Sequence, residues 1–281
     1  MAFTALGANI FVDTNRLRRG SHASPTLVYN TENAALTLGP RVPDDVCDLR
    51  AAMAVGEKLY AVTSFSLTTV LSWAPTTKVQ PGDPPMDWSW NSLSTPTPTP
   101  INGTEIITYA LHPDGHTIFM STKDETYSFD TSHGVWKKPG DWVLPFRGQA
   151  YFDADLDAWV GIHNKDDGHI CCCPVASRCT TATPQLQRRM LKEKLFRSME
   201  EVKVDHRHYK PTLTYMGDSR FCLVENVLCG EDFSDGAVIH VTLFGLKYDH
   251  KGELQTKARR TTRSYAVSKN SHLFSHAVFW M

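Results

Sequence analysis

Three aspartates at alternate positions, Asp153, Asp155 and Asp157, have the spacing of the first three ligands of a calcium-binding loop. The rest of such a loop does not follow. Ala158 stands at the position of the turn glycine, and Asn164 stands where the bidentate glutamate belongs. We therefore expect a solvated hairpin tip here rather than a calcium site.

A second group has ligand types that suit zinc: His169, Cys171, Cys173 and Cys179. Cys171 and Cys173 would share one face of a strand, but no second ligand pair follows at the usual spacing. We expect a buried strand of small apolar thiols, with all seven cysteines free and no bound metal. A further cluster, which we interpret as part of an exposed connection, comprises Asp205, His206 and His208.

Composition limits the classes of function. The 281 residues are 41% hydrophobic and 21% charged, which is enough to bury a sizeable core. Lys+Arg is 29 and Asp+Glu is 30, a net charge of -1, so we expect neither nucleic-acid nor membrane binding by bulk electrostatics. No apolar run approaches the roughly 20 residues of a membrane-spanning helix. The first residues carry no basic region ahead of their apolar stretch, so we expect no signal peptide.

Cysteine usage predicts a reducing compartment. The number of cysteines, seven, is odd, and Cys171, Cys172 and Cys173 are adjacent. Neighbouring residues of a strand point to opposite faces, which makes these three a poor disulfide framework. We therefore expect the cytoplasm, the nucleus or both.

The elements that would position these residues are β-strands, because the dominant hydrophobic period is two. Four pairs of short strand-like runs flank tight turns and predict β-hairpins. They are residues 51–55 with 59–63, 106–111 with 117–121, 149–152 with 158–162, and 213–215 with 221–225. A third and a fourth run follow each hairpin, which is the pattern of a propeller blade.

The count of these units predicts one all-β domain over residues 1–281, a five-bladed β-propeller with four-stranded antiparallel blades. Four blades are complete, at residues 49–95, 105–139, 147–196 and 210–265. Residues 8–40 contain three runs and residues 272–281 contain one, so we expect these strands of the two termini to mix in one blade and close the ring. Six blades is the alternative.

Two segments interrupt this pattern. Residues 80–86 and 93–101 are rich in proline, and we interpret them as connections between blades rather than a ligand for a proline-binding module. Residues 185–204 combine basic and apolar side chains and fit either an amphipathic helix or the last strand of a blade with a loop. For the first half of this segment we favour a strand.

Three stretches resemble a known family: residues 140–152 (GDWVLPFRGQAYF), residues 215–225 (YMGDSRFCLVE), and residues 243–248 (LFGLKY) with the ending FWM. They are similar to the plant family, expanded in grasses, that is catalogued as domain of unknown function 1668. The resemblance covers nearly the whole chain. It implies a kelch-like propeller, and it brings no established reaction and no catalytic residues.

The predicted inner strands argue against an acidic active site. Propeller glycosidases place paired carboxylates around the central channel. The five inner runs expected here, residues 50–54, 106–110, 148–152, 211–215 and 275–279, contain no Asp or Glu. No Gly-x-Ser-x-Gly elbow, phosphate loop or dinucleotide fingerprint occurs, so we expect no enzyme activity and no cofactor.

Two functions remain as hypotheses. The first is a non-catalytic scaffold or adaptor that binds another protein through loops, and the alternative is a carbohydrate-binding or glycoside-processing propeller. Two long loops, residues 79–90 and 226–236, are the expected contact surface. The candidate contact residues are Met86, Trp88, Val227, Leu228 and Phe233. Trp88 and Trp90 have a second interpretation, as core residues of a fourth strand.

Overall fold

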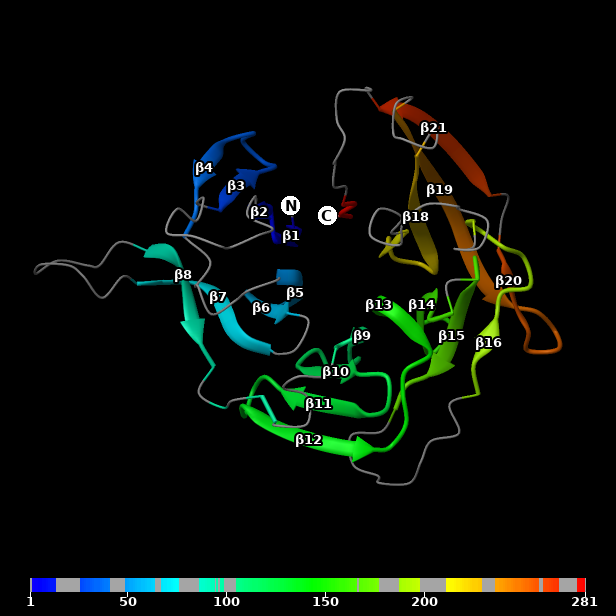
Figure 1. Cartoon of the computed structure of the whole chain (residues 1–281), viewed down its shortest axis with the longest axis horizontal. Coiled ribbons are helices and arrows are strands. Elements are labelled where there is room, and N and C mark those ends of the chain that lie inside the picture. The colour runs from blue at the N-terminus through cyan, green and yellow to red at the C-terminus, as the bar shows by residue number, and fades with distance from the viewer. Residues whose placement is uncertain are drawn as a thin grey trace, which may run out of the picture.

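The computed structural model describes an all-β chain (Figure 1). It describes residues 2–13, 26–40, 49–63, 67–75, 86–93, 95, 97–98, 105–165, 167–176, 187–197, 211–228, 236–257, 260–267 and 277–280. Over these ranges there are 21 strands and no helix. A helix with the length and hydropathy needed to cross a membrane is accordingly not found in the described part of the chain.

The strands form five successive units, named here I to V. Unit I comprises β1 (Ala2–Leu6), β2 (Asn9–Asp13), β3 (Leu27–Asn30) and β4 (Leu36–Leu38). Unit II comprises β5 (Leu49–Val55), β6 (Lys58–Thr63), β7 (Leu67–Pro75) and β8 (Met86–Ser92). Unit III comprises β9 (Thr108–Leu111), β10 (Thr117–Ser121), β11 (Thr126–Asp130) and β12 (Val135–Gly140).

Units IV and V complete the set. Unit IV comprises β13 (Phe146–Asp153), β14 (Ala158–His163), β15 (Ile170–Pro174) and β16 (Arg189–Met190). Unit V comprises β17 (Thr212–Tyr215), β18 (Arg220–Leu228), β19 (Ala237–Tyr248), β20 (Leu254–Thr256) and β21 (Thr261–Val267). The first strand of each unit lies toward a common centre in Figure 1, and the later strands lie progressively outward.

The four predicted hairpins are confirmed, because each pair of runs forms an antiparallel ladder. Their turns use the expected residues. Gly56 between β5 and β6 has φ +57°, and Gly115 between β9 and β10 has φ +78°. Glycine takes this left-handed conformation without the steric penalty that a Cβ imposes. Local turn chemistry and the period of two were therefore enough to find these elements.

Units III and IV are joined into one eight-stranded sheet. Their innermost strands, β9 and β13, pair in parallel, with Thr108 opposite Gly148 and Ala110 opposite Ala150. The side chain of Thr108 adds a hydrogen bond to the Phe146 carbonyl. Unit V differs in another way, because β20 and β21 both pair with the long strand β19, at its two ends.

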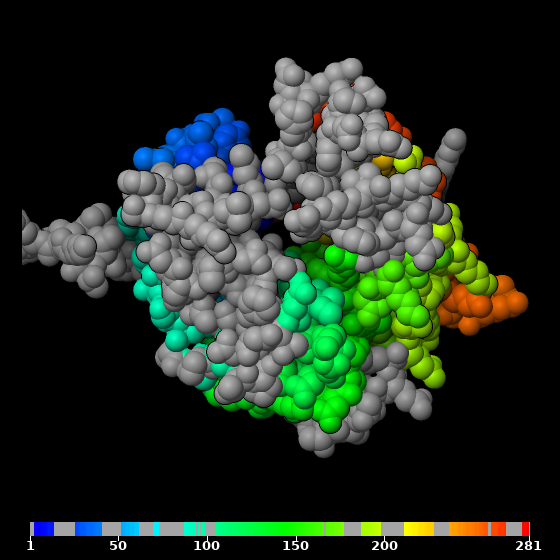
Figure 2. Space-filling view, in the orientation of Figure 1, coloured from blue at the N-terminus to red at the C-terminus, as the bar shows by residue number. Residues whose placement is uncertain are grey.

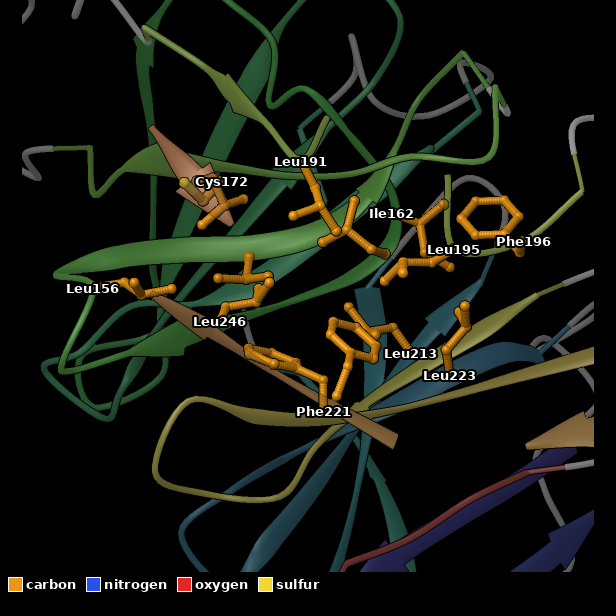
Figure 3. Close-up of a cluster of buried hydrophobic side chains, with 14 of the residues drawn as sticks. Leu156, Ile162, Cys172, Leu191, Leu195, Phe196, Leu213, Phe221, Leu223 and Leu246 are labelled. Atoms are coloured by element: carbon orange, nitrogen blue, oxygen red, sulfur yellow. The ribbon is translucent and has the colours of Figure 1, made fainter. Parts of the chain in front are cut away.

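Core clusters lie between successive units. Leu6, Phe11 and Val28 of unit I pack with Leu59 and Leu71 of unit II. Similar clusters join unit II to III, III to IV and IV to V. Figure 3 shows the last of these, in which side chains of unit IV meet side chains of unit V. Among the residues that the structure describes, no such cluster joins unit V to unit I.

The three strands predicted within residues 8–40 are confirmed, but the origin predicted for the fourth strand of this unit is wrong. Ala2–Leu6 forms a fourth strand and pairs with β2 across the turn at Gly7, so unit I needs no strand from the C-terminus. Of residues 272–281 the structure describes 277–280, which form no strand. They approach unit V, where Thr214 Oγ1 donates a hydrogen bond to the Val278 carbonyl at 3.0 Å. In the view of Figure 1 the labels of both chain ends fall near the centre.

The basic segment has a strand and no helix where it is described. Arg189–Met190 forms β16, which agrees with the strand favoured for its first half, and residues 191–197 follow without regular structure. Leu191, Leu195 and Phe196 are buried in the cluster between units IV and V. The spacing of these apolar residues therefore comes from the packing of an irregular segment into the core and not from an amphipathic helix. The proline-rich connections lie mostly outside the described residues.

Candidate functional site

The predicted contact residues lie largely in strands. Met86 and Trp88 belong to β8, so the first expected loop ends at residue 85. The Trp88 ring packs edge-on against Phe11, with ring centroids 4.9 Å apart, beside the cluster between units I and II. The second interpretation of Trp88 and Trp90, as residues of a fourth strand, is confirmed.

The second expected loop is also shorter than predicted. Val227 and Leu228 belong to β18, and Val227 is buried in the core between units IV and V. The described chain resumes at Gly236, so Phe233 lies outside the described residues. The contact role of these side chains stays a prediction. Trp88 and Val227 are packed against other side chains, which leaves other residues to supply an exposed apolar surface.

The outer hairpin of unit I presents apolar side chains to solvent. Tyr29 is 37% exposed, Leu36 is 62% exposed and Leu38 is 73% exposed. Tyr29 lies directly opposite Leu36 in the ladder, and Leu38 is two residues further along β4, so all three share one face. These residues make up three of the eight large hydrophobic side chains that are exposed in the described chain. We call this set the unit I patch.

Local sequence explains why the patch faces outward. Asn30 Oδ1 accepts hydrogen bonds from the backbone N–H groups of Glu32 and Asn33, and Asn33 Oδ1 accepts one from the N–H of Ala35. These bonds fix the turn that leads into β4. Val28 alternates with Tyr29 and is buried against unit II, which leaves Tyr29 on the free face. In Figure 2 the blue atoms of this unit lie at the rim of the molecule.

The sequence contained a signal for this patch that the prediction did not use. Leu36 and Leu38 alternate in the run that was expected to be the outermost strand of its unit. Apolar residues at alternate positions normally indicate a face that is buried. In an outermost strand with no neighbour on that side, the same pattern indicates an exposed apolar face.

Tyrosines gather where the inner strands meet. The Tyr151 hydroxyl donates a hydrogen bond to the Leu213 carbonyl at 3.0 Å, and its ring centroid is 6.5 Å from that of Tyr215. Burial raises the pKa of Tyr151, and burial and then the neighbouring Tyr151 raise the pKa of Tyr109. These phenols therefore stay neutral near pH 7 and offer hydroxyl groups and ring faces rather than charge.

The aspartates of the supposed hairpin tip are not all solvated, which corrects the prediction for Asp153. Its side chain is fully buried, while Asp155 and Asp157 are exposed. Ser219, from the turn between β17 and β18, has its hydroxyl 2.9 Å from Asp153 Oδ1 and 3.2 Å from Asp155 Oδ2. The three aspartates do not converge as calcium ligands. Instead, Asp153 and Asp155 link the turns of units IV and V.

His163 and Asp167 form a hydrogen-bonded pair in unit IV that was not predicted from the sequence. His163 Nδ1 lies 2.7 Å from Asp167 Oδ2, and His163 Nε2 lies 3.4 Å from a guanidinium nitrogen of Arg188. A guanidinium only donates hydrogen bonds, so Nε2 accepts and Nδ1 carries the proton that is donated to Asp167. Burial is the largest single influence on Asp167 and would raise its pKa, but the hydrogen bond and charge of His163 together with the backbone N–H and charge of His169 outweigh it, so the pKa is lowered. The pair braces the loop between β14 and β15.

The thiols of unit IV are packing groups, as the sequence predicts for this strand. Cys171, Cys172 and Cys173 are free and buried in β15, and Cys222 is free and buried in β18. Within the described ranges no three His, Cys, Asp or Glu side chains converge as metal ligands. Cys179 and the cluster at Asp205, His206 and His208 lie outside these ranges.

The buried thiols lead to a first testable prediction. Burial is the main cause that raises the pKa of all four cysteines, so little reactive thiolate is present at pH 8. We expect Cys171, Cys172, Cys173 and Cys222 to react slowly with a disulfide reagent in the native protein. In denaturant without reductant, all seven cysteines should react. Fast reaction of all seven in the native state would contradict the burial of this strand.

The sequence model of one protein family, described as "Protein of unknown function (DUF1668)", matches residues 1–265. This chain belongs to the DUF1668 family. The comparison with curated proteins gives no match.

Several solved structures are similar to this DUF1668 chain. A putative 6-phosphogluconolactonase from Bacteroides uniformis has 12% identity and a TM-score of 0.45, over 92% of this chain and 84% of that one. The β-propeller domain of Myceliophteria thermophila Cps50 (Swd1) has 7% identity and a TM-score of 0.45, over 90% and 69%. A complex of KlAtg21 with the coiled coil of AgAtg16 has 12% identity and a TM-score of 0.44, over 91% and 82%.

Proposed function

We propose that this DUF1668 chain is a non-catalytic protein-interaction module, a plant scaffold or adaptor of kelch-like type that works in the cytoplasm or the nucleus. Units I to V are its five propeller blades, and another protein is its partner. The observation that carries the proposal is the unit I patch, Tyr29 with Leu36 and Leu38. Contiguous exposed apolar side chains of this kind mark surfaces where proteins bind.

The patch has the composition of an interaction centre. Burying a leucine side chain in an interface contributes about 1.5–3 kcal/mol when burial is complete. Tyr29 adds an aromatic ring with a hydroxyl, a type that is common among the residues that contribute most to binding. Leu36 and Leu38 project from a three-residue strand at the edge of unit I, where a partner can reach them.

A paired substitution tests this proposal. Leu36→Asp with Leu38→Asp places two charges in the patch and should abolish recovery of the partner in affinity purification from plant tissue. The melting temperature should stay within a few degrees, because both side chains are exposed. Val135→Asp is the matched control, since Val135 is a 44% exposed apolar residue on β12, the outer strand of unit III.

Two results would overturn the proposal. One is recovery of the same partners by the Leu36→Asp/Leu38→Asp protein. The other is equal loss with Val135→Asp, which would indicate a nonspecific effect of charge. A parallel Phe233→Ala arm addresses the loop contact predicted from the sequence. Loss of the partner with Phe233→Ala alone would move the contact surface to that loop.

Carbohydrate binding at the centre is the second candidate, and the inner tyrosines are the observation that favours it. Tyr109, Tyr151 and Tyr215 supply ring faces and hydroxyl groups, and aromatic side chains with a few placed polar groups are typical of ligand-binding sites. Saturable binding of neutral oligosaccharides that is lost with Tyr215→Ala would support this candidate over the scaffold.

A further inference from the structure

The outer strand of unit V, β21, is exposed on both of its faces. Residues 261–266 are exposed and only Val267 is partly buried, and Tyr265 is 52% exposed. Within the described chain β21 pairs with β19 alone, so its other edge is open. In Figure 1 it lies along the outside of the molecule. An open edge of this kind is a template for pairing with another strand.

The outer strands of the other units are shorter, interrupted or packed. Strand β4 has three residues and β16 has two. Strand β12 contains Lys137, Lys138 and Pro139, and its register with β11 shifts. Strand β8 is as long as β21, but Trp88 and Trp90 pack against the core. Strand β21 pairs with β19 over seven residues without a shift, and it contains no proline and a single charge, on Arg263.

The sequence of β21 is complementary to itself in the antiparallel sense. If two copies pair about Ser264, Arg263 of each lies opposite Tyr265 of the other, and Thr262 lies opposite Ala266. Directly opposite side chains in such a ladder are close enough to touch. An arginine over a tyrosine ring is favourable, and this chain already contains such a pair, with Arg189 Cζ 4.6 Å from the centre of the Tyr248 ring.

Within β21 no like charges lie directly opposite each other in this arrangement. Arg263 is the only charged residue of β21, and it faces a ring rather than the second Arg263. The net charge of -1 leaves little long-range repulsion between copies. Pairing of whole units edge to edge also occurs within the chain, where β9 and β13 join two units into one sheet.

We propose that β21 is the dimerisation strand of this protein, and that two copies pair antiparallel about Ser264 to continue the sheet of unit V across a two-fold axis. The partner on this edge is a second copy of the same chain. This surface is separate from the unit I patch, and the inference does not depend on the proposed scaffold function.

Sedimentation velocity of the full chain over a wide concentration range tests the proposal. The wild-type chain should show a concentration-dependent monomer–dimer equilibrium. Tyr265→Arg removes both ring contacts and places like charges opposite each other twice, so it should raise the dimer dissociation constant by roughly tenfold or more. Its melting temperature as a monomer should be unchanged within a few degrees, because Tyr265 is exposed.

A double variant tests the antiparallel register about Ser264. Arg263→Glu combined with Tyr265→Arg places opposite charges across the pair, in place of the arginine–ring contacts, and should restore the dimer to near wild-type affinity. A wild-type chain that stays monomeric at every concentration would overturn the proposal and leave this edge to a different protein. A dimer that Tyr265→Arg does not weaken, or that the double variant does not restore, would also overturn it.

Discussion

Replacing Trp159 by alanine is expected to lower the free energy of unfolding by about 3–5 kcal/mol. Trp159 is fully buried between units III and IV, and its ring centroid lies 5.3 Å from that of Phe119. Its indole N–H donates a hydrogen bond to the Leu111 carbonyl at 2.9 Å. The alanine variant removes the largest fully buried side chain of the cluster that joins the two halves of the eight-stranded sheet. Urea unfolding followed by circular dichroism measures the change.

Trp159→Phe is the matched control for this prediction. It keeps an aromatic ring in the cluster but leaves the Leu111 carbonyl without its indole donor. A buried acceptor left unpaired costs about 1–3 kcal/mol, so this variant should lie between the wild type and Trp159→Ala. If Trp159→Ala destabilises the protein by less than 1 kcal/mol, units III and IV are not packed through this side chain.

Replacing Gly168 by alanine should destabilise the protein by more than about 3 kcal/mol. Gly168 has φ +88°, a conformation that a side chain disfavours by about 1–2 kcal/mol. A Cβ at this position would also lie 2.4 Å from the Phe196 carbonyl oxygen, which is backbone and has no rotamer to change. Leu195 donates a hydrogen bond to the Gly168 carbonyl, so the clash would push two buried residues, Leu195 and Phe196, out of the core.

Gly252→Ala is the control that separates the cost of the backbone conformation from the cost of the contact with Phe196. Gly252 has φ +76° in the turn between β19 and β20, and a Cβ there would meet nothing within 4 Å. Its destabilisation should be about 1–2 kcal/mol, from the backbone conformation alone. Equal effects of Gly168→Ala and Gly252→Ala in urea unfolding would show that the contact with Phe196 is unimportant.

The hairpins of units II to V could be predicted because their information is local. A run with a period of two, a turn that contains glycine or aspartate and a second run lie within about 15 residues of each other. The same information was present for unit I, where Gly7 has φ +54° between β1 and β2. The prediction passed over Ala2–Leu6 and assigned its place to residues 272–281, so that error came from overlooking a turn signal.

The sequence by itself determined the strands, their order and most of their turns, since the alternation of side chains and the conformational freedom of glycine act between neighbours in the chain. Only the tertiary structure decided which faces are covered. Val28 and Tyr29 are adjacent and both apolar, yet Val28 is buried against unit II and Tyr29 is exposed. Asp153 is buried because Ser219, which is far along the chain, reaches it from unit V. Burial depends on which unit packs beside which, and hydrophobic attraction is not directional, so no local pattern of residues specifies it.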